Sequence, residues 1–278
     1  MLNAITFLFV FLAIQIAVTM GTGLVLRHIP GTDPAGTAAT IVSMALFSAI
    51  TAAVFIAAKW CRVSPAWLRT RQWGVLLWSA LAAVGAAIPS VWLQEQMPAL
   101  PDMVGEQVGL ILESRWGYVA VGLMVPFAEE LVFRGAMLSA LLARLARPWT
   151  AILVSALLFA LAHLNPAQMP HALLAGILLG WMYWRTGSIL PGIAFHWVNN
   201  SVAYVLCNIM PAPDAPLVTL FGGSQRHVWL ALLFSLFILV PSVVQLGLRM
   251  RRAQAAPAPG AGSAAGPGHR KKQLFAKK

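Results

Sequence analysis

The stretch WGYVAVGLMVPFAEELVFRGAMLSALLA, residues 116–143, decides the fold. It exceeds the roughly 20 apolar residues that a helix needs to cross a bilayer. Its only charged residues are Glu129, Glu130 and Arg134. A charged side chain at the bilayer centre costs about 2.5–3.5 kcal/mol on insertion scales, so it is rare without a partner or a role. The stretch therefore predicts a membrane-spanning helix that carries a functional site.

Seven other apolar stretches extend this prediction over most of the chain: about 3–26, 37–58, 74–93, 149–165, 170–184, 188–210 and 228–248. The composition agrees, because 59% of the 278 residues are hydrophobic and 10% are charged, against about 25% charged in soluble domains. Each segment in lipid must satisfy its own backbone hydrogen bonds, and these runs are too long for barrel strands. We expect an all-α polytopic transmembrane helix bundle of about eight spans.

The chain divides into four expected parts: N-terminal transmembrane helices and loops over 1–115, a helix core with the candidate site over 116–210, a final transmembrane helix over 211–252, and a disordered basic tail over 253–278. The tail is rich in Ala, Pro and Gly, which cannot form a packed core. The first apolar stretch is longer than a signal-peptide core and follows no basic residue. We interpret it as a retained span.

The basic residues predict the orientation. With a cytoplasmic N-terminus, 15 of the 19 Lys and Arg residues fall on the cytoplasmic side, and the positive-inside rule selects this topology. The outer loops then hold only Arg27, Arg115 and Arg226 among the basic residues. We expect an integral protein of the bacterial cytoplasmic membrane with both termini inside. Nucleic acid is excluded as a partner despite the net charge of +11, because the positive charge lies in loops and the tail.

The charges within 116–143 have a helical spacing. Glu130 and Arg134 are four residues apart and can pair on one face, whereas Glu129 points about 100° away from Glu130. One glutamate can thus be neutralised while the other faces a cavity. The alternative is an ionic clamp of all three side chains that only holds helices together.

Two later stretches add histidines. Phe159 and His163 are one turn apart, and His196 and Asn200 are four residues apart on one face. Taken singly, each pair is compatible with core packing or an interhelical hydrogen bond. At 1.5 Å per residue, however, Glu129, His163 and Asn200 lie about 18–22 Å from the cytoplasmic ends of their helices, and His196 about 12 Å. This similar depth favours one shared site.

The ordered set Glu129-Glu130-x-x-x-Arg134, Phe159-x-x-x-His163 and His196-x-x-x-Asn200 resembles the CPBP family of CAAX proteases and bacteriocin-processing enzymes. The stretch from Trp184 to Gly192, WRTGSILPG, also resembles the approach to the family's last motif. The resemblance covers roughly residues 115–210. It implies an intramembrane endopeptidase that acts on a membrane-anchored or hydrophobic peptide within the lipid bilayer.

Peptide hydrolysis requires a water, a base that activates it and donors for the oxyanion. On the resemblance, Glu129 is the expected general base and His163 helps to orient the water. His196 and Asn200 face the oxyanion, while Glu130 and Arg134 form a supporting pair. His171 is expected at the membrane interface, Asn165 and Gln168 along an access path, and Asn199 on another helix face.

Three alternatives stay open. Glu129, His163 and His196 could bind a divalent metal such as zinc, although no HExxH-type pair is present and no cofactor is favoured. Cys61 and Cys207 have no metal-type spacing. The chain could instead be a non-enzymatic scaffold or immunity protein of the same family. A proton-coupled transporter would also place acids in the membrane, but the sequence has no evident inverted repeat.

Overall fold

The computed structural model describes residues 2–61, 73–210 and 215–250, and these residues form helices and connecting loops. The long helices before the central span are α1 (Leu2–Leu26), α2 (Thr37–Ala57) and α4 (Trp73–Glu95), followed by the short α5 (Gly105–Leu112). After it come α9 (Pro148–Ala162), α10 (Met169–Thr186), α11 (Leu190–Ile209), the short α12 (Leu217–Leu220) and α13 (Gln225–Arg249). The predicted all-α class is confirmed for the described residues.

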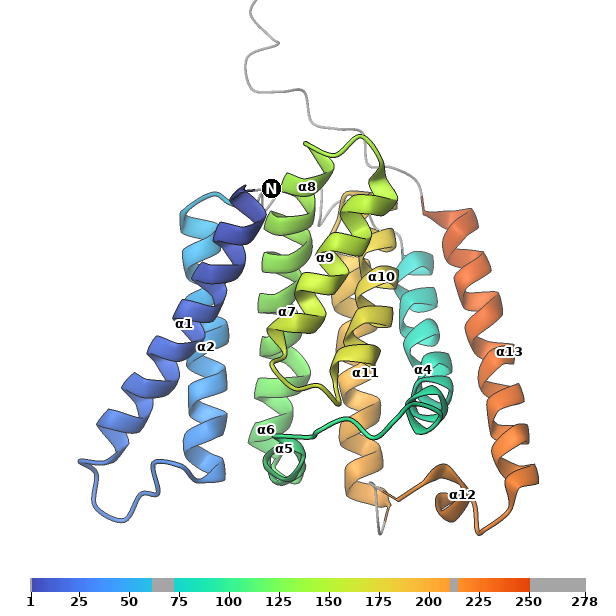
Figure 1. The fold of residues 1–278 in the computed structure, drawn as a ribbon, viewed down its shortest axis with the longest axis horizontal. Helices are drawn as coiled ribbons and strands as arrows, with labels where there is room; N and C mark the ends of the chain where they lie inside the picture. Colours follow the sequence, from blue (N-terminus) through green and yellow to red (C-terminus); the bar gives the residue numbers. More distant parts are fainter. Residues whose placement is uncertain (1, 62–72, 211–214, 251–278) are drawn as a thin grey trace, which may run out of the picture.

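The long helices stand side by side in one bundle, with the central helix, α9, α10 and α11 in the middle (Figure 1). The pair α1 and α2 lies on one flank, and α4 and α13 lie on the other. The short α5 and the loop before it cross the end of the bundle that is distal to the N-terminus. The segments with the predicted site residues therefore lie at the centre of the bundle.

The central helix runs from Arg115 to Leu142 but changes its winding along the way. It consists of α6 (Arg115–Gly117), the π-helical η1 (Tyr118–Met124), α7 (Val125–Glu129), the π-helical η2 (Glu130–Leu138) and α8 (Ser139–Leu142). Pro126 lies in the first turn of α7, two residues after η1 ends, and has no N–H to continue the hydrogen-bond ladder, which accounts for a local change of winding. The change from α to π winding falls between the two glutamates, and such turns are frequent at functional sites.

Five helices in the described residues are long and apolar enough to cross a membrane: α1, α2, α4, the central helix and α13. The prediction of about eight spans is thus not confirmed as a count. Helix α9 has 15 residues, and α10 and α11 carry polar residues that lower their hydropathy. All eight predicted stretches nevertheless form helices close to their expected ranges. The chain is an integral membrane protein with a helical core.

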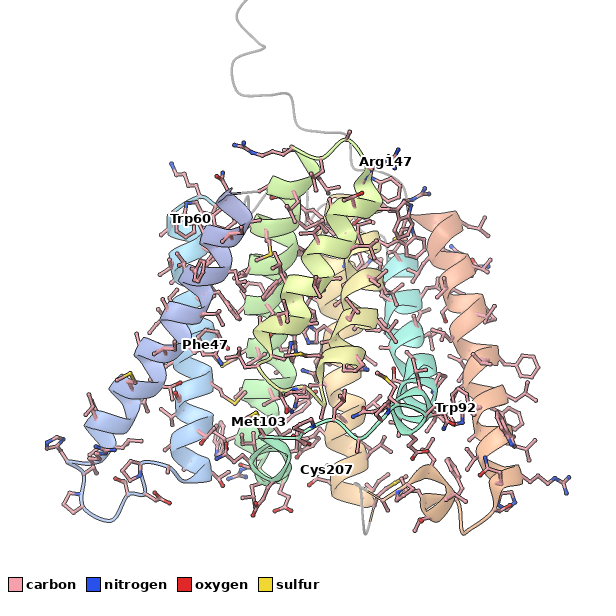
Figure 2. All side chains as sticks on the ribbon, viewed as in Figure 1. Phe47, Trp60, Trp92, Met103, Arg147 and Cys207 are labelled. Atoms are coloured by element: carbon pink, nitrogen blue, oxygen red, sulfur yellow. The ribbon has the colours of Figure 1, made fainter. Side chains whose placement is uncertain are left out.

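Charge is unevenly divided between the two ends of the bundle (Figure 2). Among the described residues, the end with the N-terminus has five basic residues and no acids: Lys59, Arg144, Arg147, Arg185 and Arg249. The opposite end has Arg27, Arg115 and Arg226 with the acids Asp33, Glu95, Asp102, Glu106 and Glu113. The remaining predicted loop charges, including Asp214, and the basic tail lie outside the described residues.

Candidate active site

The two adjacent glutamates have different surroundings. Glu130 is 0% exposed, and its Oε1 lies 2.7 Å from Nη1 of Arg134, which is 1% exposed. The Arg134 guanidinium also stacks 4.3 Å above the Phe159 ring. The Glu129 side chain keeps 14% exposure and lines a cavity. The i,i+4 spacing thus produces a sealed ion pair, and it leaves the neighbouring carboxylate facing open space.

His196 on α11 lies between the two carboxylates. Its Nε2 is 3.7 Å from Oε2 of Glu129, and its Nδ1 is 3.4 Å from Oε1 of Glu130. The sequence predicted this ring beside the oxyanion position, together with Asn200. The structure adds that the ring bridges the exposed and the buried glutamate, so it couples the supporting ion pair to the cavity.

His163 is the residue directly after α9. Its Nδ1 lies 2.9 Å from the carbonyl oxygen of Phe159, and because a carbonyl only accepts, Nδ1 carries the hydrogen. The Nε2 lone pair is then free to accept a hydrogen bond in the cavity that His163 lines. The next residue, Leu164, has φ of 53°, a left-handed conformation that is strained for a leucine. The chain therefore turns sharply directly after the histidine.

Asn200 belongs to a polar network that extends beyond the motif. Its Nδ2 donates to the carbonyl of Val121 at 2.8 Å, and its Oδ1 accepts from Asn199 at 3.3 Å. The Asn199 amide also lies 3.3 Å from Nε2 of His171. Asn199 and His171 both line the cavity. The sequence prediction that Asn199 points away from the site is therefore wrong, whereas the expected interfacial place of His171 stays a prediction.

Asn165 is fully buried and does not line the cavity as an access residue. Its Oδ1 accepts from the Met103 N–H at 3.0 Å, and its Nδ2 donates to Oδ1 of Asp102 at 2.9 Å. This clasp ties the loop before α5 to the turn after His163. Gln168, by contrast, lines the cavity as expected. The clasp made by Asn165 has no sequence signature, because it depends on a loop that is distant along the chain.

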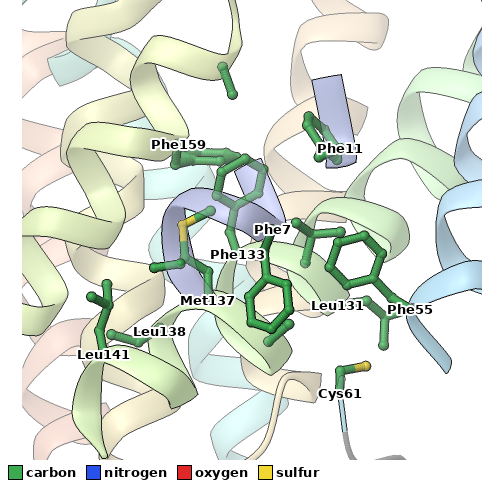
Figure 3. Close-up of a cluster of buried hydrophobic side chains, with 14 of the residues drawn as sticks. Phe7, Phe11, Phe55, Cys61, Leu131, Phe133, Met137, Leu138, Leu141 and Phe159 are labelled. Carbon is green, nitrogen blue, oxygen red and sulfur yellow. The ribbon is translucent and has the colours of Figure 1, made fainter. Parts of the chain in front are cut away.

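The cavity has a volume of about 550 Å³, within the range of small-ligand sites. Its inner end is formed by Phe11, Phe47 and Phe159. Phe133 packs behind them, with ring centroids 5.2 Å from Phe11 and 5.0 Å from Phe159. Behind Phe133 lies the aromatic and aliphatic core that contains Phe7, Phe55, Met137 and Leu138 (Figure 3). All six predicted site residues lie around this inner part of the cavity or directly behind its wall.

The metal alternative finds no preformed ligand set. Within residues 2–61, 73–210 and 215–250, no group of three or more His, Cys, Asp and Glu side chains is arranged to hold a metal ion. Glu129 and His196 approach each other, but His163 does not complete a ligand set with them.

A substitution at Gly192 tests how closely α11 approaches the buried ion pair. A Cβ on Gly192 would overlap Oε2 of Glu130, so Gly192→Ala must displace the carboxylate or the helix. We expect a loss of about 1–3 kcal/mol in unfolding free energy, as for other overpacked cores. Thermal unfolding in detergent measures this. Gly21→Ala is the matched control, because nothing lies within 4 Å of its added Cβ. Equal stability of both variants would contradict the described contact.

Comparison with known proteins gives one family match. Residues 111–202 match the family described as type II CAAX prenyl endopeptidase Rce1-like. No curated protein and no solved structure matches the chain. The matched segment includes the central helix from its start, α9, α10 and α11 through Asn200, and therefore every predicted site residue.

Proposed function

Because residues 111–202 belong to the CPBP and CAAX protease family, we propose that this membrane protein is an endopeptidase that hydrolyses a peptide bond of a membrane-anchored or hydrophobic substrate. One observation supports the proposal above the others. Of two adjacent glutamates, one is sealed in an ion pair with Arg134, and the other faces a cavity that it shares with His163 and His196. A structural clamp of Glu129, Glu130 and Arg134 would leave neither glutamate facing a cavity.

Glu129 and His163 are the proposed water-activating pair. Both can accept a hydrogen bond, Glu129 through its carboxylate and His163 through Nε2, which has no hydrogen when Nδ1 donates to Phe159. A water that donates one hydrogen to each keeps a lone pair for attack. Glu129 takes one proton as the water oxygen bonds to the substrate carbonyl carbon. The same proton then passes to the leaving nitrogen as the C–N bond breaks, which returns Glu129 to its starting form.

Asn200 and His196 are the proposed oxyanion donors. Asn200 donates one amide hydrogen to the Val121 carbonyl, and its Oδ1 accepts from Asn199. Its second amide hydrogen therefore remains for the oxyanion. His196 presents Nε2 on the Glu129 side of the cavity. Donors that are fixed before the reaction stabilise the developing charge without reorganisation. His171 and Asn199 position Asn200, since they fix which side of its amide faces the cavity.

The reaction is proposed to need no cofactor. A glutamate with a histidine can activate water directly, whereas a zinc hydrolase uses three protein ligands around its metal. Exhaustive chelation of the purified protein, with metal content measured by elemental analysis, is therefore expected to leave activity unchanged. Loss of activity that returns with zinc would assign the hydrolysis to a metal.

The proposed activity is tested with the purified protein in liposomes and a peptide panel analysed by mass spectrometry. The panel contains a prenylated CAAX peptide, its unprenylated form and hydrophobic membrane peptides. We expect the wild type to cleave at least one peptide and His163→Phe to lose about 10²-fold or more in kcat, because phenylalanine keeps the ring but not the acceptor. His227→Phe, at the exposed start of α13, is the matched control. A fully active His163→Phe variant, or a wild type that cleaves none of the panel, would contradict the proposal.

A further inference from the structure

The cavity reaches only one end of the bundle. On α1 its lining runs from Phe11 to Gly23, and on α2 it runs from Ala39 to Phe47. Helix α1 starts at the basic end and α2 finishes there, so most of this lining lies in the halves distal to that end (Figure 1). The basic ends of both helices contribute nothing to the lining: no lining residue comes from the first nine positions of the chain or from the last ten residues of α2. The aromatic core behind Phe11, Phe47 and Phe159 closes the remaining half.

The mouth of the cavity lies at the acidic end. It is bordered by Thr22 and Gly23 on α1, by Pro34 in the loop that follows, and by Val104 and Gln107 beside or on α5. These segments share the end of the bundle that carries Asp102, Glu106 and Glu113. The opposite end has the excess of basic residues and faces the cytoplasm under the positive-inside rule. The mouth and the cytoplasm are thus on opposite sides.

A row of polar side chains follows the cavity wall away from the glutamates. Gln15, Thr19 and Thr22 on α1 are spaced i, i+4 and i+7, which places them on one face, and all three line the cavity. Thr40 and Ser43 on α2 line it as well, and the Ser43 hydroxyl lies 3.4 Å from that of Thr19. Gln15 has no hydrogen-bond partner within the described residues. Its amide can both donate and accept.

We infer that the substrate reaches Glu129 from the extracytoplasmic side, as an extended peptide whose backbone lies along this polar row on α1 and α2. The inference rests on the proposed endopeptidase activity. An extended backbone inside a membrane leaves its N–H and C=O groups unpaired at a cost of several kcal/mol each, so it needs partners on the protein. The amide and hydroxyl groups of the polar row can supply these hydrogen-bond partners without selecting for a particular side chain of the substrate. The substrate class is therefore a peptide presented at the outer face, not a cytosolic protein tail.

The side of approach is tested by cysteine labelling, which does not depend on activity. Cys207→Ser removes the partly exposed native thiol. Cys61 can remain, because it is buried and burial raises its pKa to about 11, which keeps it a protonated thiol at neutral pH. Into this background we introduce Gln107→Cys at the mouth or Arg147→Cys at the basic end. Both wild-type side chains are exposed.

A membrane-impermeant maleimide is then added to right-side-out or inside-out membrane vesicles. We expect Gln107→Cys to react at least tenfold faster in right-side-out vesicles and Arg147→Cys at least tenfold faster in inside-out vesicles. The reverse pattern, or equal reaction from both sides, would overturn the inference. Purified protein in detergent is accessible from both ends, so its peptidase activity tests the proposed function separately.

The polar row is tested with Gln15→Leu in the purified protein. Loss of one net hydrogen bond to the peptide backbone is expected to raise KM about tenfold and leave kcat close to the wild-type value. Ile16→Leu is the matched control, because Ile16 is exposed on the outside of α1 and does not line the cavity. An unchanged KM for Gln15→Leu on every cleaved peptide would remove the row from substrate binding.

Discussion

Glu129→Gln is expected to lower kcat by about 10²–10⁴-fold while the protein keeps its folding stability. Glutamine has nearly the shape of glutamate, but its amide cannot take the proton from water. Oε2 of Glu129 has no hydrogen-bond partner within the described residues, so little native structure depends on the charge. The measurement pairs steady-state cleavage of a panel peptide with thermal unfolding in detergent.

Glu130→Gln separates the roles of the two adjacent acids. Because Glu130 is fully buried against Arg134, its neutralisation leaves a buried cation without its partner, and we expect the main effect on stability. Glu106→Gln on the exposed surface of α5 is the control that should change neither quantity. If Glu129→Gln stays active and Glu130→Gln is inactive but fully stable, the two glutamates have the opposite roles.

Arg134→Met is expected to cause the largest loss of stability, about 3–5 kcal/mol. Removal of one partner from a buried ion pair leaves the other charge uncompensated. Arg134 is 1% exposed, and the removed guanidinium also lies over Phe159 and within 3.5 Å of the Gly176 carbonyl. The unfolding midpoint in a denaturant series, followed by tryptophan fluorescence, measures the loss.

The double variant Glu130→Leu/Arg134→Met identifies the cause of this destabilisation. Replacing both partners of a buried pair by apolar residues is often neutral or stabilising, so the double variant should regain most of the lost stability. It should not regain activity, because His196 would lose the carboxylate that faces its Nδ1. A double variant as unstable as Arg134→Met would show that packing on Phe159, and not the unpaired charge, dominates.

The helices were predictable from the sequence, because a long apolar run in lipid has few alternatives to a helix. Helix α9 was predicted at 149–165 and is found at Pro148–Ala162, which makes His163 the residue after the helix. Helix α5 was not predicted. Its sequence, GEQVGLIL, has only eight residues, too few for a convincing period, and its position depends on the clasp between Asn165 and the preceding loop.

The candidate site was predictable in its residues but not in its detailed contacts. The depth argument brought Glu129, His163 and Asn200 to a similar level, with His196 nearer the cytoplasm, and the structure places all four around one cavity. The bridge made by His196 was not predicted, since face arguments assume 100° per residue and the central helix changes to π winding between its glutamates. Asn199 was misplaced because its contact with His171 joins two helices whose rotation no single-sequence pattern fixes.

The inner end of the cavity is an aromatic floor made of Phe11, Phe47 and Phe159, with Phe133 packed behind them. This floor affects how a voltage acts across the membrane. In the proposed hydrolase, water reaches mid-membrane from one side only, so a voltage across the bilayer falls mainly over the half that holds no water. Moving one elementary charge across 100 mV releases about 2.3 kcal/mol of free energy, so a proton at Glu129 would be driven through any gap in the floor. Phe11, Phe47, Phe133 and Phe159 pack edge-on in this layer, and the Arg134 guanidinium that lies over Phe159 is paired with Glu130. On the proposed function, the layer that ends the cavity also insulates the membrane against proton leakage.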